Sequence, residues 1–522
     1  MTKNQENKNE LIHERKSLIL KKSIFILAII AIIGLGIRLY YFSYEIPVTS
    51  DALTYFLHAT DAIVVSGFPN TAVANNGWPL FLSLFFGLVQ SNNFLDHSAV
   101  QQLLSISISV LTIIPVYLIC KKFVKNEYAL LGAGIFVLEP RIIQNSVLGI
   151  TEPLYIILGS ISLLFFLSNK ISFTMVAFGF VAITTMVRAE GLFLLIPFSI
   201  MFFIKYKTEK KIILKFLLAL GIFFIILSPM TLYKMDVRDG DDAIFGRVAS
   251  SISDSSIIYK DNSQGFFEYV EKSVIKFLQF IGWIQIPVFI IFLPLGIFLI
   301  FKNRNNNSKT IILSISCMLI PAFYGISTGP DTRYLYFLYP MFCVISVLAI
   351  EKIVVNKKNS VKILMLIFVM IFLASSIFLS LKMNDIEYEK DAVKVAQFLV
   401  NNASGINDYH PEASYVRSTI VESEEYPKLA KNIQFDKVKK FNINYDNLEE
   451  FIENHRNEGL SHLVIDKKNN QFEFMNEIFV NEENYSYLKK EFDSSEFEMK
   501  YQVKIFQINY QEFDKKNSKS HE

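Results

Sequence analysis

Charged residues are scarce in this chain of 522 residues. Only 19% of the sequence is Asp, Glu, Lys or Arg, whereas 52% is hydrophobic and 48 residues are phenylalanine. A soluble domain averages about 25% charged residues. Apolar runs of about 17–25 residues, the length that crosses a bilayer as a helix, recur over the first three quarters of the chain. The composition excludes an ordinary soluble protein and predicts a polytopic α-helical membrane protein that carries one soluble domain.

Cysteine and histidine are also few. The three cysteines, Cys120, Cys317 and Cys343, lie in or beside apolar runs without metal-ligand spacing, so a disulfide framework is not indicated. The seven histidines are scattered and form no metal-site pattern. A Gly-rich phosphate loop is missing from the tail, and no basic stripe with interleaved aromatic residues is present. These absences argue against nucleotide and nucleic-acid binding.

The apolar runs predict eleven transmembrane helices. They fall near residues 24–44, 100–120, 128–147, 153–168, 172–187, 190–204, 212–233, 276–301, 310–328, 333–350 and 361–381. A further run, "WPLFLSLFFGLV" from Trp78 to Val89, is too short to cross and is typical of an interfacial or re-entrant helix.

Lysine and arginine predict the orientation of these helices. They occur before the first helix and after the second, fourth, sixth, eighth and tenth, so every second loop is basic. Basic loops stay in the cytoplasm. The pattern predicts a cytoplasmic N-terminus and, after eleven crossings, an extracytoplasmic C-terminal domain of a multi-pass cell-membrane protein.

Three regions follow. Residues 1–23 form a cytoplasmic segment, residues 24–382 a transmembrane domain with external loops 45–99 and 234–275, and residues 383–522 a soluble α/β domain. In this tail "DAVKVAQFLVNNA" and "DNLEEFIENHRNEG" are predicted helices, the second stopped by Gly459, whereas "SHLVID" and "YQVKIFQINY" are predicted strands. The tail has 18 basic and 27 acidic residues from Asn384 onward, against 33 and 22 before it, so the two parts face different surroundings.

Charged residues gather at the predicted external helix ends. They are Asp51, Glu139, Arg141, Glu152, Arg188, Glu190, Asp331 and Arg333. Charges at the mouth of a helical bundle are costly and often functional. Asp51, Tyr55 and His58 are spaced i, i+4 and i+7, which places them on one face of a helix, while Leu53, Phe56 and Ile63 are expected to meet the membrane. A carboxylate there could accept a proton from a hydroxyl, and arginines could hold a phosphate.

The order of these features resembles the GT-C membrane glycosyltransferases. The features are an external Asp after the first helix, two interfacial helices, "TE" at the start of the fourth helix, an Arg-containing hairpin in "MVRAEGLF" and a late "RYLYFLYP". The resemblance covers about residues 20–350 and is nearest to the protein O-mannosyltransferase and aminoarabinose transferase group (glycosyltransferase family 39 and its neighbours). It implies a GT-C-like fold and a sugar donor linked to a lipid phosphate.

The resemblance also implies residue roles. Asp51 matches the catalytic base and Glu152 the second acidic position, while Arg188 and Arg333 match basic residues at the donor phosphate. Tyr55, His58, Trp78, Glu190 and Tyr334 are the expected substrate-binding residues. One departure is that Ala52 follows Asp51 where many relatives have Glu, whose role is either lost or taken by Asp61 or Glu152.

The predicted reaction moves one hexose, such as mannose, from a polyprenyl or dolichyl monophosphate to a hydroxyl of a protein, glycan or lipid on the outer face, with inversion and without a divalent metal. One alternative is an oligosaccharyltransferase; that class normally carries a Trp-Trp-Asp type motif, whereas Trp78 and Trp283 lie elsewhere. Another is a transporter or lipid flippase, although no internal repeat was found. A third is an inactive relative that acts as an assembly subunit.

Simpler interpretations exist for individual residues. Asp51 could be a helix N-cap, and Arg188 with Glu190 could be a structural pair that closes a hairpin. Arg333 could extend to the interface at a helix end. Trp78 and the tyrosines of "RYLYFLYP" could belong to an interfacial aromatic belt.

Overall fold

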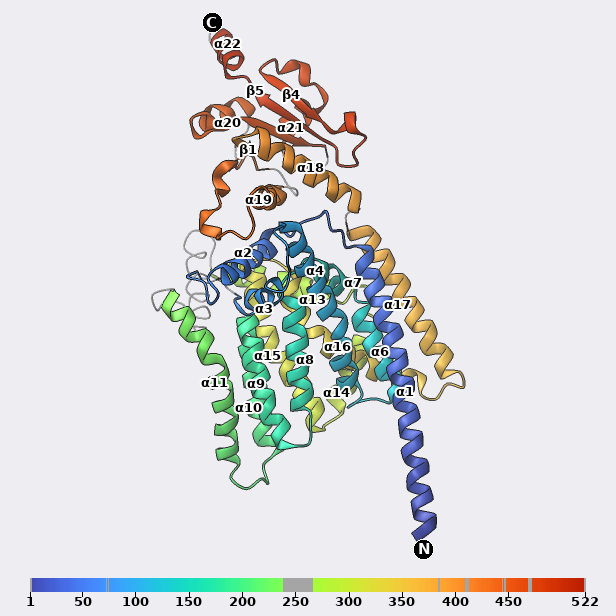
Figure 1. Ribbon diagram of the computed structural model, residues 1–522. Helices are drawn as coiled ribbons and strands as arrows, with labels where there is room; N and C mark the ends of the chain where they lie inside the picture. The colour runs from blue at the N-terminus through green and yellow to red at the C-terminus, as the bar shows by residue number, and fades with distance from the viewer. Residues whose placement is uncertain are drawn as a thin grey trace. The chain divides into compact units, whose positions relative to one another are not determined.

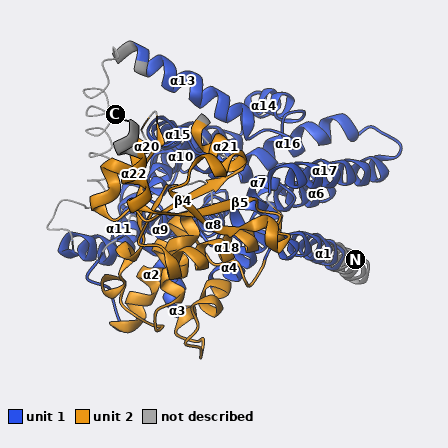
Figure 2. Cartoon of the chain, turned by 90° about the horizontal axis from the view of Figure 1, so that it is seen from above, with its two compact units in different colours: residues 1–42, 67–84, 101–383 blue, residues 43–66, 85–100, 384–522 orange. Residues whose placement is uncertain are grey.

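The chain folds into two compact units. The computed structural model describes residues 2–71, 73, 75–237, 266–383, 385–408, 413–443, 445, 447–467 and 472–520 (Figure 1). Unit 1 comprises Met1–Phe42, Gly67–Leu84 and Gln101–Met383, and unit 2 comprises Ser43–Ser66, Phe85–Val100 and Asn384–Glu522 (Figure 2). Unit 2 therefore contains two stretches of the predicted loop 45–99 in addition to the tail.

Unit 1 is a bundle of helices. Its helices are α1 (Thr2–Tyr40), α3 (Gly77–Phe86), α4 (Phe94–Leu111), α5 (Ile113–Cys120), α6 (Asn126–Val137), α7 (Pro140–Val147), α8 (Glu152–Phe166), α9 (Ile171–Val187), η1 (Ala189–Leu194), α10 (Leu195–Lys205), α11 (Ile212–Val237), α13 (Phe266–Trp283), α14 (Leu293–Lys302), α15 (Asn306–Thr328), η2 (Thr332–Leu338), α16 (Tyr339–Val354) and α17 (Ser360–Lys382). The last residues of α3 and the first of α4 belong to unit 2.

The membrane character of unit 1 is confirmed, but not the number of crossings. Within the described residues six helices are long and apolar enough to span a bilayer, near Leu20–Tyr40, Phe94–Cys120, Ile212–Val237, Asn306–Thr328, Thr332–Val354 and Ser360–Asn402. Two other predicted spans are interrupted. Segment 128–147 breaks before Pro140, which lacks a backbone N–H and starts α7, and segment 276–301 breaks between α13 and α14. Eleven crossings and their orientation remain predictions.

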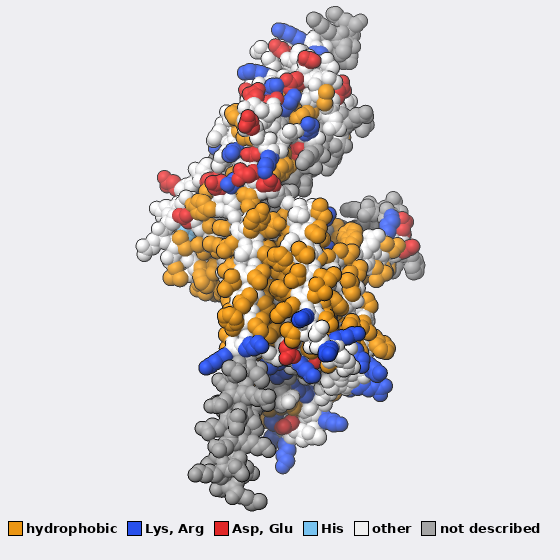
Figure 3. All heavy atoms as spheres, turned by 90° about the vertical axis from the view of Figure 1, so that its right-hand side faces the viewer, with side chains coloured by type: hydrophobic (Ala, Val, Ile, Leu, Met, Phe, Trp, Pro, Cys, Tyr) orange, Lys and Arg blue, Asp and Glu red, His pale blue; other side chains and the backbone are white. Residues whose placement is uncertain are grey.

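Apolar side chains cover this bundle on the face shown in Figure 3, and Lys and Arg side chains gather at one end of its helices. A buried arginine joins the helices inside. Arg38 of α1 is 0% exposed. It donates hydrogen bonds to Ser109 Oγ of α4 (3.1 Å), to Val137 O of α6 (3.0 Å) and to Ser146 Oγ of α7 (3.1 Å). These bonds satisfy a charge that would otherwise be costly in the bundle interior.

Unit 2 contains the predicted α/β domain. Its elements are α2 (Ser50–Val64), α18 (Ile386–Asn402), β1 (Gly405–Asn407), α19 (Ala413–Glu422), η3 (Ala430–Asn432), η4 (Phe435–Lys437), β2 (Lys439–Phe441), α20 (Leu448–His455), η5 (Arg456–Glu458), β3 (His462–Asp466), α21 (Glu473–Val480), η6 (Glu482–Asn484), β4 (Leu488–Asp493), η7 (Ser494–Phe497), β5 (Val503–Ile508) and α22 (Tyr510–Ser520).

The sheet of unit 2 has the order β2-β1-β3-β5-β4. Strands β2, β1 and β3 are parallel, and β5 is antiparallel to β3 and β4. Both predicted strands and both predicted helices of the tail are present. The helical run that begins at α20 ends at Gly459, whose φ of 104° suits glycine.

Aromatic residues tie α2 to the rest of unit 2. Phe56 packs against Phe86 (ring centroids 5.2 Å apart), Phe94 (4.8 Å) and Tyr426 (5.8 Å) and is fully buried. Leu53 is buried as well. The expectation that Leu53 and Phe56 meet the membrane is therefore wrong, because the apolar side of α2 packs inside the protein.

Candidate functional site

The Arg188 hairpin of unit 1 is a tight turn between two helices. Helix α9 ends at Val187, Arg188 is extended (φ −146°, ψ 130°), and η1 begins at Ala189. The turn closes at Gly191, where a Cβ atom would lie 2.8 Å from the backbone nitrogen of Thr185. Glycine therefore allows the chain to fold back and to present Arg188 beside α8.

Arg188 lies between two carboxylates. Its Nη1 donates to Glu152 Oε1 in a short ion pair, and to Thr151 Oγ1 at 3.3 Å. Its Nη2 donates to Glu190 Oε1 at 2.8 Å. The Arg188 side chain is only 11% exposed and that of Glu152 only 2%. The predicted Arg188–Glu190 hairpin pair is present, and Glu152 joins it from the start of α8.

Two tyrosines complete the surroundings of this arginine. The guanidinium carbon lies 5.8 Å from the ring centroid of Tyr155 on α8 and 5.8 Å from that of Tyr334 on η2. Such contacts are favourable cation–π interactions. Gly325 of α15 supports the Tyr334 ring so closely that a Cβ atom would lie 2.5 Å from it. Sequence reasoning did not assign Thr151 and Tyr155, although both flank Glu152 in "GITEPLY".

Arg333 adds a second guanidinium next to Tyr334 in the chain. Its Nε is 2.6 Å from Asp331 Oδ2, and Asp331 also caps η2 by accepting from the backbone N–H of Arg333 at 2.8 Å. Both side chains are about one third exposed. We define Thr151, Glu152, Tyr155, Arg188, Glu190 and Tyr334 as the arginine cluster, with the Asp331–Arg333 pair on the same short segment as Tyr334.

The charges of these residues restrict what can bind. Arg188 is paired with the carboxylates of Glu152 and Glu190. Arg333 is paired with that of Asp331. An incoming phosphate would therefore compete with a carboxylate for guanidinium N–H groups. Guanidinium binds phosphate and carboxylate in the same bidentate geometry, so such an exchange is chemically feasible.

A second charged pair lies at the start of α7. Glu139 is fully buried and caps α7, and its Oε1 is 3.8 Å from Arg141 Nη1. Arg141 donates to the carbonyl of Ile286 and lies 4.7 Å above the ring of Phe378.

Trp78 is enclosed by protein atoms of unit 1. It is 0% exposed, and its indole N–H donates to Gly149 O at 3.1 Å. Neighbouring Gly77 packs so tightly on α9 that a Cβ atom would lie 2.7 Å from the backbone of Met186 and Val187. Protein atoms cover the ring, so the interfacial-belt interpretation of Trp78 is wrong, whereas its predicted substrate-binding role stays a prediction.

Tyr336 and Tyr339 of "RYLYFLYP" do not fit the interpretation as an interfacial aromatic belt either. Tyr336 is 6% exposed and Tyr339 is 0% exposed. Tyr339 donates to Ile284 O at 3.2 Å. Both pack inside unit 1, whereas a belt residue would face the lipid headgroups.

The remaining predicted residues, Asp51, Tyr55 and His58, belong to unit 2. The N-cap of α2 is Thr49, and Asp51 lies exposed in the first helical turn, so the N-cap interpretation of Asp51 is wrong. Tyr55 is 7% and His58 is 2% exposed. Their predicted roles stay predictions.

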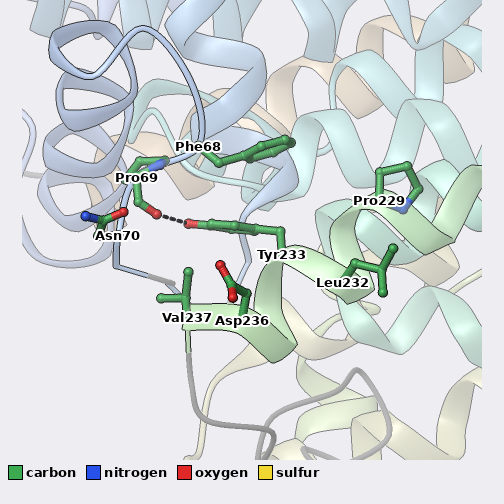
Figure 4. Close-up of a pocket in the computed structure, with 8 residues that line it drawn as sticks. All are labelled: Phe68, Pro69, Asn70, Pro229, Leu232, Tyr233, Asp236 and Val237. Carbon is green, nitrogen blue, oxygen red and sulfur yellow. Dashed lines mark hydrogen bonds between the residues drawn. The ribbon is translucent and has the colours of Figure 1, made fainter.

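A shallow groove lies between the end of α11 and residues 68–70 (Figure 4). Tyr233 stacks on Phe68 with ring centroids 4.7 Å apart and donates to Pro69 O at 3.0 Å. Asp236 and Asn70 supply polar groups along it, and its volume is about 510 Å³. Most of predicted loop 234–275, which follows this groove, lies outside the described residues. Among the described residues no three His, Cys, Asp or Glu side chains group as metal ligands.

The chain matches no family model and no curated protein, but it resembles solved structures. The oligosaccharyltransferase of Archaeoglobus fulgidus, solved with zinc and sulfate, superposes with a TM-score of 0.54 at 11% identity, over 84% of this chain and 68% of that chain. The same enzyme tethered to an acceptor peptide gives 0.54 at 12% identity, over 85% and 69%. ArnT from Cupriavidus metallidurans gives 0.50 at 8% identity, over 94% of this chain and 98% of that chain.

These structures share little sequence with the chain, but each aligns with most of its length. Both enzymes belong to the GT-C superfamily. The protein therefore has the fold of the GT-C membrane glycosyltransferases, as the order of its charged motifs predicted.

Proposed function

We propose that the protein is a membrane glycosyltransferase that moves one hexose, such as mannose, from a polyprenyl or dolichyl monophosphate to a hydroxyl group. The GT-C fold supports this activity. One solved complex of the A. fulgidus enzyme contains a dolichol phosphate and superposes on the chain with a TM-score of 0.50 over 85% of its length and 69% of that chain. A lipid-linked phosphate donor is therefore the expected substrate class.

The observation that carries the proposal is Arg188. A guanidinium held by two carboxylates and two tyrosine rings is fixed in place before a substrate arrives. Preorganised charge of this kind stabilises negative charge that develops in a transition state. The leaving group in this reaction is a lipid phosphate, which gains negative charge as the bond to the sugar breaks.

The proposed reaction is a single displacement. The acceptor hydroxyl loses its proton to the Asp51 carboxylate, and its oxygen forms a bond to the anomeric carbon. The bond between that carbon and the phosphate oxygen breaks, and the lipid phosphate leaves with the electron pair. The configuration at the anomeric carbon inverts. Arg188 and Arg333 stabilise the departing phosphate, and no divalent metal takes part.

In this proposal Glu152 does not transfer a proton but positions Arg188. Its carboxylate is almost fully buried and ion-paired with Arg188. Such a group positions the guanidinium and balances its charge. Asp51 remains the proposed general base because of its place in the sequence after the first predicted membrane helix, in the first turn of α2.

An oligosaccharyltransferase is the second candidate. The A. fulgidus enzyme whose fold resembles this chain is an oligosaccharyltransferase, which keeps this class as a candidate. Two outcomes would indicate this class: asparagine as the acceptor residue, and loss of activity with a chelator.

The test is transfer by the purified full-length chain from a panel of labelled polyprenyl-phosphate sugars. Asp51→Asn should lower the rate at least about a hundredfold, since a general base contributes that much or more. Donor binding and melting temperature should stay unchanged. Asp514→Asn is the matched control, because Asp514 forms an exposed pair with Arg456 in unit 2. Full activity of Asp51→Asn would rule out the base assignment, and no transfer from any donor would rule out the reaction.

A further inference from the structure

A polar pocket lies at the end of unit 1 opposite the arginine cluster. Helix α10 follows η1 and ends at Lys205, and the pocket is formed there by the ends of α8 and α10 and the start of α15. Its volume is about 470 Å³. Every lining residue is polar, including Lys205, Tyr206, Thr208 and the consecutive Asn305, Asn306 and Asn307.

The pocket lining holds one cation, Lys205, and one carboxylate, Glu209. Lys205 Nζ donates to the carbonyls of Phe166 (2.7 Å) and Ser168, and no carboxylate pairs with it among the described residues. The one acidic lining residue, Glu209, is already paired with Lys215 at 2.6 Å. With Lys215 counted, two ammonium groups face one carboxylate here, and a partly buried ammonium favours an anion nearby.

The start of α15 adds to this preference. This helix has 23 residues, and Asn305 caps it by accepting from the Ser308 N–H at 2.7 Å. The amides of the first turn and the helix dipole favour a negative group there. The lysine and the start of α15 therefore both favour a negatively charged ligand in the pocket.

The length of α15 places this pocket relative to a bilayer. The helix packs against α10 and reaches Gly325, beside Tyr334 of the arginine cluster. Twenty-three helical residues extend about 34 Å, and the hydrocarbon core of a bilayer is about 30 Å thick. When α15 spans the membrane, the two sites lie at the headgroup levels of opposite leaflets.

We propose that this pocket binds the phosphate of an anionic phospholipid from the leaflet opposite the arginine cluster. A free phosphate ion carries the same chemistry, but the position of the pocket at the start of a helix long enough to span a bilayer favours the lipid. The bound headgroup would bridge α10, which begins after η1 of the Arg188 hairpin, and α15, which passes Tyr334 of the arginine cluster at Gly325. The inference does not depend on the proposed glycosyl transfer.

The test uses the full chain in nanodiscs and reads thermal stability. Phosphatidylcholine discs are compared with discs that also contain phosphatidylglycerol, and inorganic phosphate is added to the neutral discs as a separate arm. The anionic lipid should raise the melting temperature and bind in native mass spectrometry after delipidation. Inorganic phosphate should have little effect.

Asn307→Asp places a negative charge in the pocket and keeps a residue suited to the first turn of a helix. It should weaken phosphatidylglycerol binding about fivefold, as expected for one charge near a helix start. Asn359→Asp is the matched control, since Asn359 is the exposed N-cap residue of α17 and lies outside the pocket. The proposal is overturned if both variants bind the lipid like the unmodified chain, or if inorganic phosphate stabilises the chain as well as the lipid does.

Discussion

At the scale of single residues, the arginine cluster shows how one cation can be both structural and functional. Arg188 closes the hairpin with Glu190 and also reaches Glu152 on another helix. A buried ion pair is weak support for stability, but the loss of one partner leaves an uncompensated charge behind. Stability and activity should therefore respond differently to changes at these residues.

Arg188→Gln should destabilise the protein by about 3–5 kcal/mol, because two carboxylates lose their shared cation. Adding Glu152→Gln to Arg188→Gln should recover part of that stability, since it removes one of the unpaired charges. Sugar transfer should not recover, because the phosphate-stabilising guanidinium is still missing. Melting temperature and transfer rate of the single and double variants test this. If activity returned with stability, Arg188 would be only structural.

Asp61 makes a pH-dependent contribution to unit 2. Burial raises the pKa of this carboxyl, even though the Ala430 N–H donates to its Oδ1 at 2.8 Å. A carboxyl with a raised pKa in the folded state stabilises the fold at low pH, and this stabilisation is lost as the pH rises through the folded pKa. Asp61→Asn, which keeps an acceptor for Ala430, should raise the melting temperature at pH 7. The gain should shrink or reverse as the pH falls below the usual carboxyl pKa, as measured by thermal unfolding over a pH series.

At the scale of elements, close helix contacts at glycine residues set the position of η2. A Cβ atom at Gly159 of α8 would lie 2.1 Å from the Phe337 ring, and one at Gly325 of α15 would lie 2.5 Å from the Tyr334 ring. These helices hold η2 from two sides, and η2 carries both Arg333 and Tyr334.

Gly325→Ala should move Tyr334 away from Arg188 and lower sugar transfer, because the new methyl group occupies the space of the ring. We expect a loss of about tenfold, as a misplacement of about 1 Å at a site can cost more than that. Gly221→Ala in α11 is the matched control, since nothing lies within 4 Å of its added Cβ. A fully active Gly325→Ala variant would show that the Tyr334 position is unimportant.

At the scale of the whole molecule, the chain crosses between its two units several times. Unit 2 takes residues 43–66 and 85–100 from the N-terminal part, and these residues pack on the tail. His97 lies 4.4 Å from the Tyr426 ring, and Ser418 donates to Val48 O at 2.7 Å. The tail therefore shares its packing with residues 43–66 and 85–100 of unit 2.

A fragment of residues 384–522 made alone should keep its sheet but lose protection around residues 413–432, where the contacts with Phe56, His97 and Val48 are missing. Hydrogen exchange of the fragment and of the full chain tests this. Strands β3 and β5 should exchange slowly in both, because their core lies inside the tail. Equal protection of 413–432 in both would show that these contacts contribute little.

The sequence by itself determined the membrane character, the α/β tail and the Arg188–Glu190 hairpin, since apolar run length, residue periodicity and short-range charge pairs are local properties. The tertiary structure decided where helices break and which side chains are buried, because these depend on contacts between distant segments. Pro140 divides a run that looked like one span, and Phe56 turns inward because aromatic partners from distant segments cover it. Trp78 is enclosed, since Gly77 lets its segment approach α9. Which residues surround Arg188 also depends on packing, because Glu152 and Tyr155 come from α8 and Tyr334 from η2, and no single stretch of sequence specifies how these elements approach each other.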